Sequence, residues 1–300
     1  MTKQIKILIT GILLLIASGC GNNSVELENT YEPKLVIQAL IFPGQKVDGI
    51  FVTRNIPINT NPDPLSVVIS NADLRITDLQ TNQEYKLSFN AQKFSYEYKK
   101  DDLVIQYDRS YKLSINGYVD GKLLSGYSIT KTPKRGFSII KSKTISGDIK
   151  YRELDNTGYV KPIPVNFNIS EGTIFYPISL VALDASVDNF IYDNAYRQVE
   201  RKDVIEKLDN FKYQQRQLQN INPEGKVIEY DLNWTPIWFY SKYRMIIYAG
   251  DENFRQFSLT YRGVQEFDGN FHEPKINITG DAIGVFASLI ADTVYFNVKK

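Results

Sequence analysis

The sequence has almost none of the residues on which metal sites and nucleophilic catalysis most often depend. Its 300 residues include one cysteine, Cys20, and one histidine, His272. A single cysteine forms no disulfide within the chain, and a single histidine excludes a metal site built from two or three histidines of one chain. We interpret His272 as structural, because it follows Asp268-Gly-Asn in what reads as a turn before a strand.

Sequence motifs for nucleotide binding and for serine hydrolases are also missing. The chain contains no Gly-x-Ser-x-Gly, no P-loop and no Gly-x-Gly-x-x-Gly. A carboxylate-dependent carbohydrate-active hydrolase stays open as an alternative, because its two carboxyl groups are defined by their separation in space. We therefore expect no catalytic residues, no metal and no cofactor, and a protein that is not an enzyme.

The charges are balanced, so the chain has no excess of one sign to attract a strongly charged polymer or membrane. Without the two lysines among the first six residues, 33 basic residues stand against 34 acidic ones. No basic excess is present to bind nucleic acid, and no polybasic segment to hold anionic lipid. We expect no nucleic-acid partner.

An apolar run at the N-terminus is the clearest functional signal. Residues 7–17 follow two lysines and are too few to span a bilayer, which is typical of a secretory signal. Three small residues, 17–19, precede Cys20, as in a bacterial lipobox, whose cysteine is diacylated and becomes the first mature residue. An ordinary signal peptide is the alternative and would leave an exposed thiol. We predict a lipoprotein signal peptide over 1–19, lipidation at Cys20 and a polar tether over 20–33.

Residues 34–133 have the pattern of short strands separated by turns. Apolar and polar residues alternate over 72–77, 85–89 and 111–115, and Asp120-Gly121 lies between two strand patterns, as in a β-hairpin. Seven or eight strands over about a hundred residues predict an immunoglobulin-like β-sandwich.

A second β-rich domain is predicted over residues 134–300, after the turn signal at 133–136. It carries one helix near 203–218, where Asp203 and Glu206 have capping-box spacing and apolar residues share one face. Strand patterns return after it, including one at 254–261. The fold class is therefore all-β.

Aromatic residues gather in one segment of this second domain. Trp234, Trp238, Tyr240 and Tyr243 lie within ten residues of each other. An exposed cluster of this kind stacks on sugar rings or anchors a protein partner, whereas a buried one fills a core. Both interpretations are open, and these four residues are our candidate ligand contact.

The C-terminal block carries a resemblance to a known family. Asn270-Phe-His-Glu-Pro274 is followed by Ile-Asn-Ile-Thr-Gly over 276–280 and Ile-Gly-Val-Phe-Ala over 283–287. Together with the lipobox and the first strand pattern at 34–40, this resembles a Bacteroidota lipoprotein family known as domain of unknown function 4249. Asp281-Ala282 departs from the family, in which a glycine is more usual. The resemblance implies a role beside TonB-dependent outer-membrane receptors and no known catalytic residues.

We therefore expect an outer-membrane lipoprotein that binds a ligand or receptor as a non-enzymatic accessory of TonB-dependent nutrient uptake. Its lipidated Cys20 is the membrane contact, and either the periplasmic or the surface-facing side fits. A TonB-dependent receptor is the expected partner, and the small-molecule or glycan ligand is open. A structural or adhesive envelope module is a further alternative.

Overall fold

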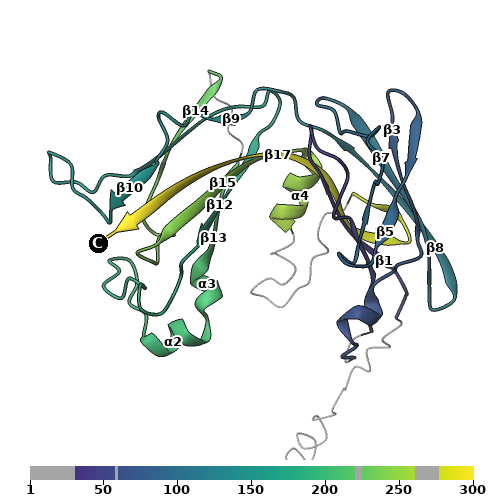
Figure 1. Cartoon of the computed structure of the whole chain (residues 1–300), viewed down its shortest axis with the longest axis horizontal. Helices are drawn as coiled ribbons and strands as arrows, with labels where there is room; N and C mark the ends of the chain where they lie inside the picture. The colour runs from purple at the N-terminus through teal and green to yellow at the C-terminus, as the bar shows by residue number, and fades with distance from the viewer. Residues whose placement is uncertain (1–30, 58–59, 220–224, 261–276) are drawn as a thin grey trace, which may run out of the picture. The chain divides into compact units, whose positions relative to one another are not determined.

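The computed structural model describes residues 31–57, 60–219, 225–260 and 277–300 (Figure 1). The chain divides into two units, of which one comprises residues 33–56 and 61–300 and contains every element discussed below. The other comprises residues 1–32 and 57–60 and has only residues 31, 32, 57 and 60 among those described. Cys20, the signal peptide and His272 lie outside the described residues. No helix among the described ranges is long and apolar enough to cross a membrane.

Strands make up most of the regular structure, so the all-β prediction is confirmed. The strands are β1 (Leu35–Ile41), β2 (Phe51–Arg54), β3 (Asp73–Asp78), β4 (Gln83–Lys86), β5 (Ser88–Asn90), β6 (Ser95–Glu97), β7 (Ser110–Val119), β8 (Lys122–Lys131), β9 (Ser138–Ile139), β10 (Gly147–Lys150), β11 (Ile163–Asn168), β12 (Phe175–Ala182), β13 (Tyr213–Gln219), β14 (Val227–Leu232), β15 (Lys242–Gly250), β16 (Thr279–Gly280) and β17 (Ala282–Lys299). The helices are the 3-10 helix η1 (Pro64–Val67) and the α-helices α2 (Arg201–Glu206), α3 (Leu208–Lys212) and α4 (Glu252–Thr260).

Strands β1 to β8 form a two-sheet sandwich with immunoglobulin-like connectivity. One sheet has the order β8-β7-β3-β4, with β16 added beside β8. The other contains β1 and β2, and continues to the β5–β6 hairpin through two backbone hydrogen bonds between Ile50 and Tyr96, at 3.1 and 2.7 Å. Immunoglobulin domains place strands A, B, E and D in one sheet and C, F and G in the other. Here β1, β2, β6 and β5 occupy the first set of places, and β3, β7 and β8 the second.

The alternating apolar residues of β3 and β7 fill the space between these sheets. Leu74, Ile76, Leu113 and Ile115 are buried, while the residues between them are partly exposed. The predicted hairpin is present: the two-residue turn Asp120-Gly121 joins β7 to β8, and both residues have positive φ, as a type I′ turn requires.

The 18-residue strand β17, yellow in Figure 1, contributes to two hydrophobic cores. It pairs in parallel with β1 and then antiparallel with β15, within a sheet of order β13-β12-β15-β17-β1-β2. Ala282 and Phe286 pack into the sandwich core. Val294 and Phe296 pack into a C-terminal core, to which the sheet β14-β11-β9 also contributes residues. The division of the chain at residue 133 stays a prediction.

The segment between β16 and β17 closes one edge of the sandwich. The backbone N–H of Asp281 donates to the carbonyl of Ser125 on β8 at 2.7 Å, and its carbonyl accepts from Leu35 on β1 at 3.0 Å. Gly284 has a φ of +116°, and a Cβ there would lie 2.0 Å from the carbonyl oxygen of Ile37. Only glycine allows this backbone approach, which seats β17 against β1.

The prediction of one helix reaching residue 218 is wrong in its second half. Helices α2 and α3 meet at Lys207, and residues 213–219 form strand β13, paired with β12 from Val181 to Phe175. The edge of β12 offers backbone hydrogen bonds along seven residues, and this tertiary pairing overrides the helix propensity of the glutamines.

The strand predicted at 254–261 is also wrong over its described residues, because α4 occupies Glu252–Thr260. Asp251 precedes the helix, and its side chain accepts from the backbone N–H of Phe254 at 2.9 Å. This is the N-cap interaction that begins a helix.

Candidate functional site

The four aromatic residues of the candidate ligand contact lie in or against the C-terminal core. Trp234 is 4% exposed and Trp238 9%, Tyr243 is buried, and Tyr240 is half-buried. The indole N–H of Trp234 donates to the carbonyl of Lys161 at 2.7 Å. The structure therefore places them where core residues lie, and ligand contact at these positions stays a prediction.

The polar atom of Tyr243 is also bonded within the chain. Its hydroxyl accepts from the backbone N–H groups of Trp238 and Phe239 at 3.2 and 3.0 Å. Burial raises the pKa of Tyr243 above its ordinary value. A neutral, hydrogen-bonded phenol suits a structural role.

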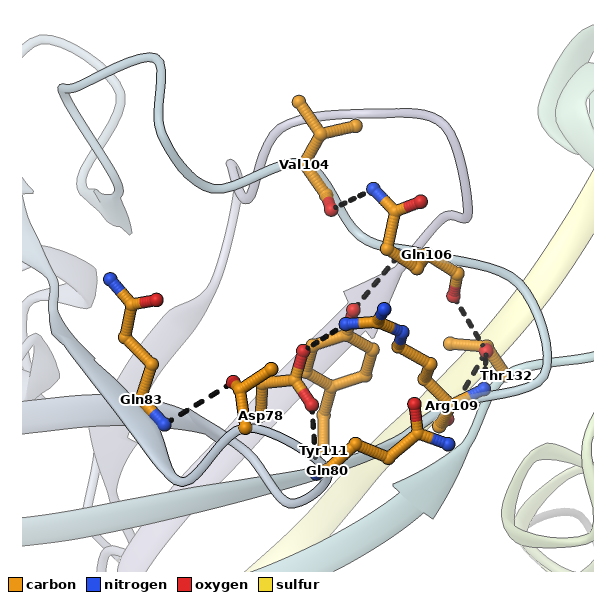
Figure 2. Close-up of polar contacts among 9 residues, drawn as sticks. Asp78, Gln80, Gln83, Val104, Gln106, Arg109, Tyr111 and Thr132 are labelled. Atoms are coloured by element: carbon orange, nitrogen blue, oxygen red, sulfur yellow. Dashed lines mark hydrogen bonds and ion pairs between the residues drawn. The ribbon is translucent and has the colours of Figure 1, made fainter.

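A polar cluster at one end of the sandwich core is shown in Figure 2. The hydroxyl of Tyr111, near the start of β7, accepts from the backbone N–H of Gln106 at 2.8 Å. This bond from a tyrosine to backbone a few residues upstream matches the tyrosine corner of immunoglobulin-like domains. It supports the strand assignment made above.

The same cluster contains a partly buried ion pair. Arg109 Nη1 donates to the carboxylate of Asp78 at 2.7 Å, and Asp78 is 5% exposed. Thr132 accepts from the backbone N–H of Arg109 at 2.9 Å and donates to the carbonyl of Gln106 at 2.8 Å (Figure 2). Because these charged groups are satisfied inside the chain, we assign the cluster to stability.

Asp251 is the described carboxyl group with the most perturbed environment. Burial raises the pKa of its side chain to about 6, against the lowering effect of a hydrogen bond from the Thr130 hydroxyl. A cavity of about 460 Å³ lies beside it. The charged residues on its wall are paired, Lys134 with Glu171 at 2.7 Å and Arg255 with Glu252 at 2.6 Å. Asp251 can thus exchange a proton near pH 6, and it caps α4.

No group of three or more His, Cys, Asp or Glu side chains that suits a metal ion occurs in the described part of the chain. The Asp268-Gly-Asn segment, predicted from the sequence to form a turn, lies outside it.

Outward positions of β8 and the end of β7 are apolar where a solvated sheet is usually polar, whereas the rest of β7 turns serine, lysine and asparagine outward. Tyr118, Leu123, Tyr127 and Ile129 point outward and are between 43% and 59% exposed. The inward positions of β8 include small polar residues, such as Ser128 and Thr130. We call the four outward residues the apolar stripe. The apolar stripe was not predicted from the sequence, although the apolar residues at alternate positions of β8 are a usable signal.

The family of this chain is shown by a match over most of its length and not by one site. A family model described as a domain of unknown function (DUF4249) matches residues 23–281. The chain belongs to the DUF4249 family. No curated protein matches it. A solved structure, the native conformation of E. coli alpha-2-macroglobulin, matches 85% of this chain and 14% of that chain, with 11% identity and a TM-score of 0.21. This TM-score is too low to support a structural argument.

The structure gives a backbone reason for two glycines in the C-terminal block of this DUF4249 chain. Gly280 and Gly284 have positive φ values at the closed edge of the sandwich. Asp281 lies between them and is not among the residues with positive φ, so its backbone conformation accommodates a side chain.

Proposed function

We propose that this DUF4249 protein is an outer-membrane lipoprotein, anchored through Cys20, that serves as a non-enzymatic accessory of a TonB-dependent receptor. The lipobox-like sequence at residues 17–20 supports the anchor. The observation that carries the receptor contact is the apolar stripe on β7 and β8.

The stripe has the composition of the centre of a protein interface. It contains two tyrosines, a leucine and an isoleucine, and Tyr118 lies directly across from Leu123 in the hairpin. Aromatic residues are enriched in interface centres and carry much of the binding energy. Fully burying an exposed apolar side chain contributes about 1.5–3 kcal/mol, so burying the exposed half of each stripe residue contributes roughly half as much. Contact with a receptor would therefore stabilise the complex while leaving the sandwich core unchanged.

Co-purification from native outer membranes tests this function. The full-length protein should retain a TonB-dependent receptor, and the double variant Tyr118→Ser/Leu123→Ser should retain at least tenfold less. The matched control is Leu154→Ser/Tyr159→Ser, which removes an exposed leucine and tyrosine far from the stripe in sequence. Equal recovery of the receptor with both double variants would refute the assignment of the stripe, and no receptor with the wild type would refute the accessory role.

A further inference from the structure

The sheet that packs one face against the C-terminal core has a second face, which is turned away from that core. On β12, β13, β15 and β17 the core residues alternate with residues that face away from the core, and we call this side the open face. One row of the open face crosses all four strands in register: Tyr213, Val181, Arg244 and Tyr295. Tyr213 is 54% exposed and Tyr295 is 49% exposed, so the row is accessible at both ends.

Arg244 in the middle of this row has no carboxylate partner among the described residues. Its Nε is buried and has no hydrogen-bond partner there. By contrast, Arg75, Arg109 and Arg255 each form an ion pair within the chain. An unsatisfied buried donor is costly, and a guanidinium is shaped to bind a carboxylate through two parallel hydrogen bonds. The unpaired guanidinium of Arg244 therefore indicates a ligand that carries an acidic group.

The aromatic residues of the row are each accompanied by a lysine. Lys212 Nζ lies 5.3 Å from the ring centre of Tyr213, and Lys242 Nζ lies 5.4 Å from that of Tyr295. The four strands contribute no aspartate or glutamate to the open face. Three cations thus lie on or beside this row, Arg244 within it, Lys212 just before Tyr213 and Lys242 two residues before Arg244, in a chain whose overall charge is balanced.

We propose that the open face binds an acidic oligosaccharide, with a carboxylate on Arg244 and sugar rings against Tyr213 and Tyr295. Adjacent strands lie about 4.8 Å apart, so β13 and β17 are separated by roughly 14 Å, a distance that a short oligosaccharide spans. Tyrosine offers an apolar ring for stacking on the C–H face of a sugar, together with a hydroxyl for its polar groups. Ser179 and Thr293 are one row away and face the same side.

This site is independent of the receptor contact, because it uses a different sheet and none of the apolar stripe. The two claims can fail separately: a protein that binds the sugar without retaining a receptor would refute only the accessory role.

Calorimetric titration of the purified full-length protein tests the inference. The probes are hexamers of galacturonate and of alginate, with the fully methyl-esterified galacturonate hexamer as the uncharged counterpart. At least one acidic hexamer should bind, and the methyl ester should bind at least tenfold more weakly. Arg244→Gln should weaken binding of the acidic hexamer at least tenfold, and Tyr213→Ala and Tyr295→Ala at least threefold each.

The matched control is Tyr159→Ala, which removes an exposed tyrosine outside the row and should leave the affinity unchanged. Circular dichroism and thermal unfolding confirm that each variant is folded. Absence of binding to both acidic hexamers would overturn the proposal, as would equal affinities of Arg244→Gln and the wild type. Binding of hexaglutamate as tightly as of the sugar would show that the face selects charge alone, and would also overturn it.

Discussion

Replacing Asp251 by asparagine should change how the stability of the protein depends on pH. The carboxyl group is largely buried at the start of α4, where it accepts from the Phe254 N–H and the Thr130 hydroxyl. Asparagine is also a good N-cap residue, and its amide can exchange a hydrogen bond with a rotated Thr130 hydroxyl. The variant therefore removes the charge while keeping the local contacts.

The sign and size of this pH dependence follow from the raised pKa of Asp251. Burial, and secondarily the nearby charge of Glu252, raise the pKa of Asp251 from 3.8 to about 6 in the folded protein. The folded state thus binds a proton more tightly than the unfolded state. The contribution of Asp251 to stability is fully present below pH 3.8 and is lost as the pH rises through 6. A difference of about two pKa units corresponds to roughly 2–3 kcal/mol.

Urea unfolding followed by tryptophan fluorescence, at several values between pH 4 and pH 8, measures this difference. The unfolding free energy of Asp251→Asn minus that of the wild type should rise by roughly 2–3 kcal/mol across that range. Asp155→Asn is the control: hydrogen bonds from Thr157 lower the pKa of Asp155 below its ordinary value of 3.8, so its pH effect lies below the measured range and its difference from the wild type should stay nearly constant. A difference that stays constant with pH for Asp251→Asn would show that the pKa of Asp251 is not raised in the folded protein.

Three further predictions concern the fold. Gly284→Ala should lower the unfolding free energy by more than about 3 kcal/mol, because its Cβ would meet a backbone carbonyl of β1 that cannot move aside. Tyr111→Phe should cost about 1–3 kcal/mol, because the N–H of Gln106 loses its acceptor inside the structure. Trp234 and Trp238 should resist quenching of their fluorescence by iodide in the folded protein, because both are buried.

Each of these has a direct check. Chemical denaturation gives the first two values, with Tyr118→Phe as the control for Tyr111→Phe, because Tyr118 is an exposed tyrosine on the same strand. Unchanged unfolding midpoints for Gly284→Ala or Tyr111→Phe would contradict the account. Iodide quenching as strong as that of free tryptophan would show that the aromatic cluster is open to solvent.

The sandwich could be predicted because its strands follow local rules. Two of these rules are the period-two alternation of β3 and β7 and the turn at Asp120-Gly121. Both are properties of short segments, and both are present in the structure. The family was recognisable for a related reason, since its glycines at 280 and 284 meet a backbone requirement that no other residue satisfies.

The remainder depends on contacts between distant segments, which local patterns do not contain. Residues 213–219 form a strand because they pair with the edge of β12. Residues 252–260 form a helix, and only their last part, from Phe257 to Thr260, alternates like a strand. The residues Tyr213, Arg244 and Tyr295 come from three strands and are up to 82 positions apart in the chain, so no local sequence motif predicts that they share a row. Conversely, Trp234 and Trp238 are close in sequence, but both side chains are buried in the C-terminal core.

The most direct test of the central claim is the mass of the N-terminal peptide of the mature protein, isolated from membranes of the native host. Our account predicts a peptide that begins at Cys20 and carries acyl chains on that residue, in a protein recovered with the outer membrane. A mature chain that begins elsewhere, or that begins at Cys20 with an unmodified thiol, would contradict the account.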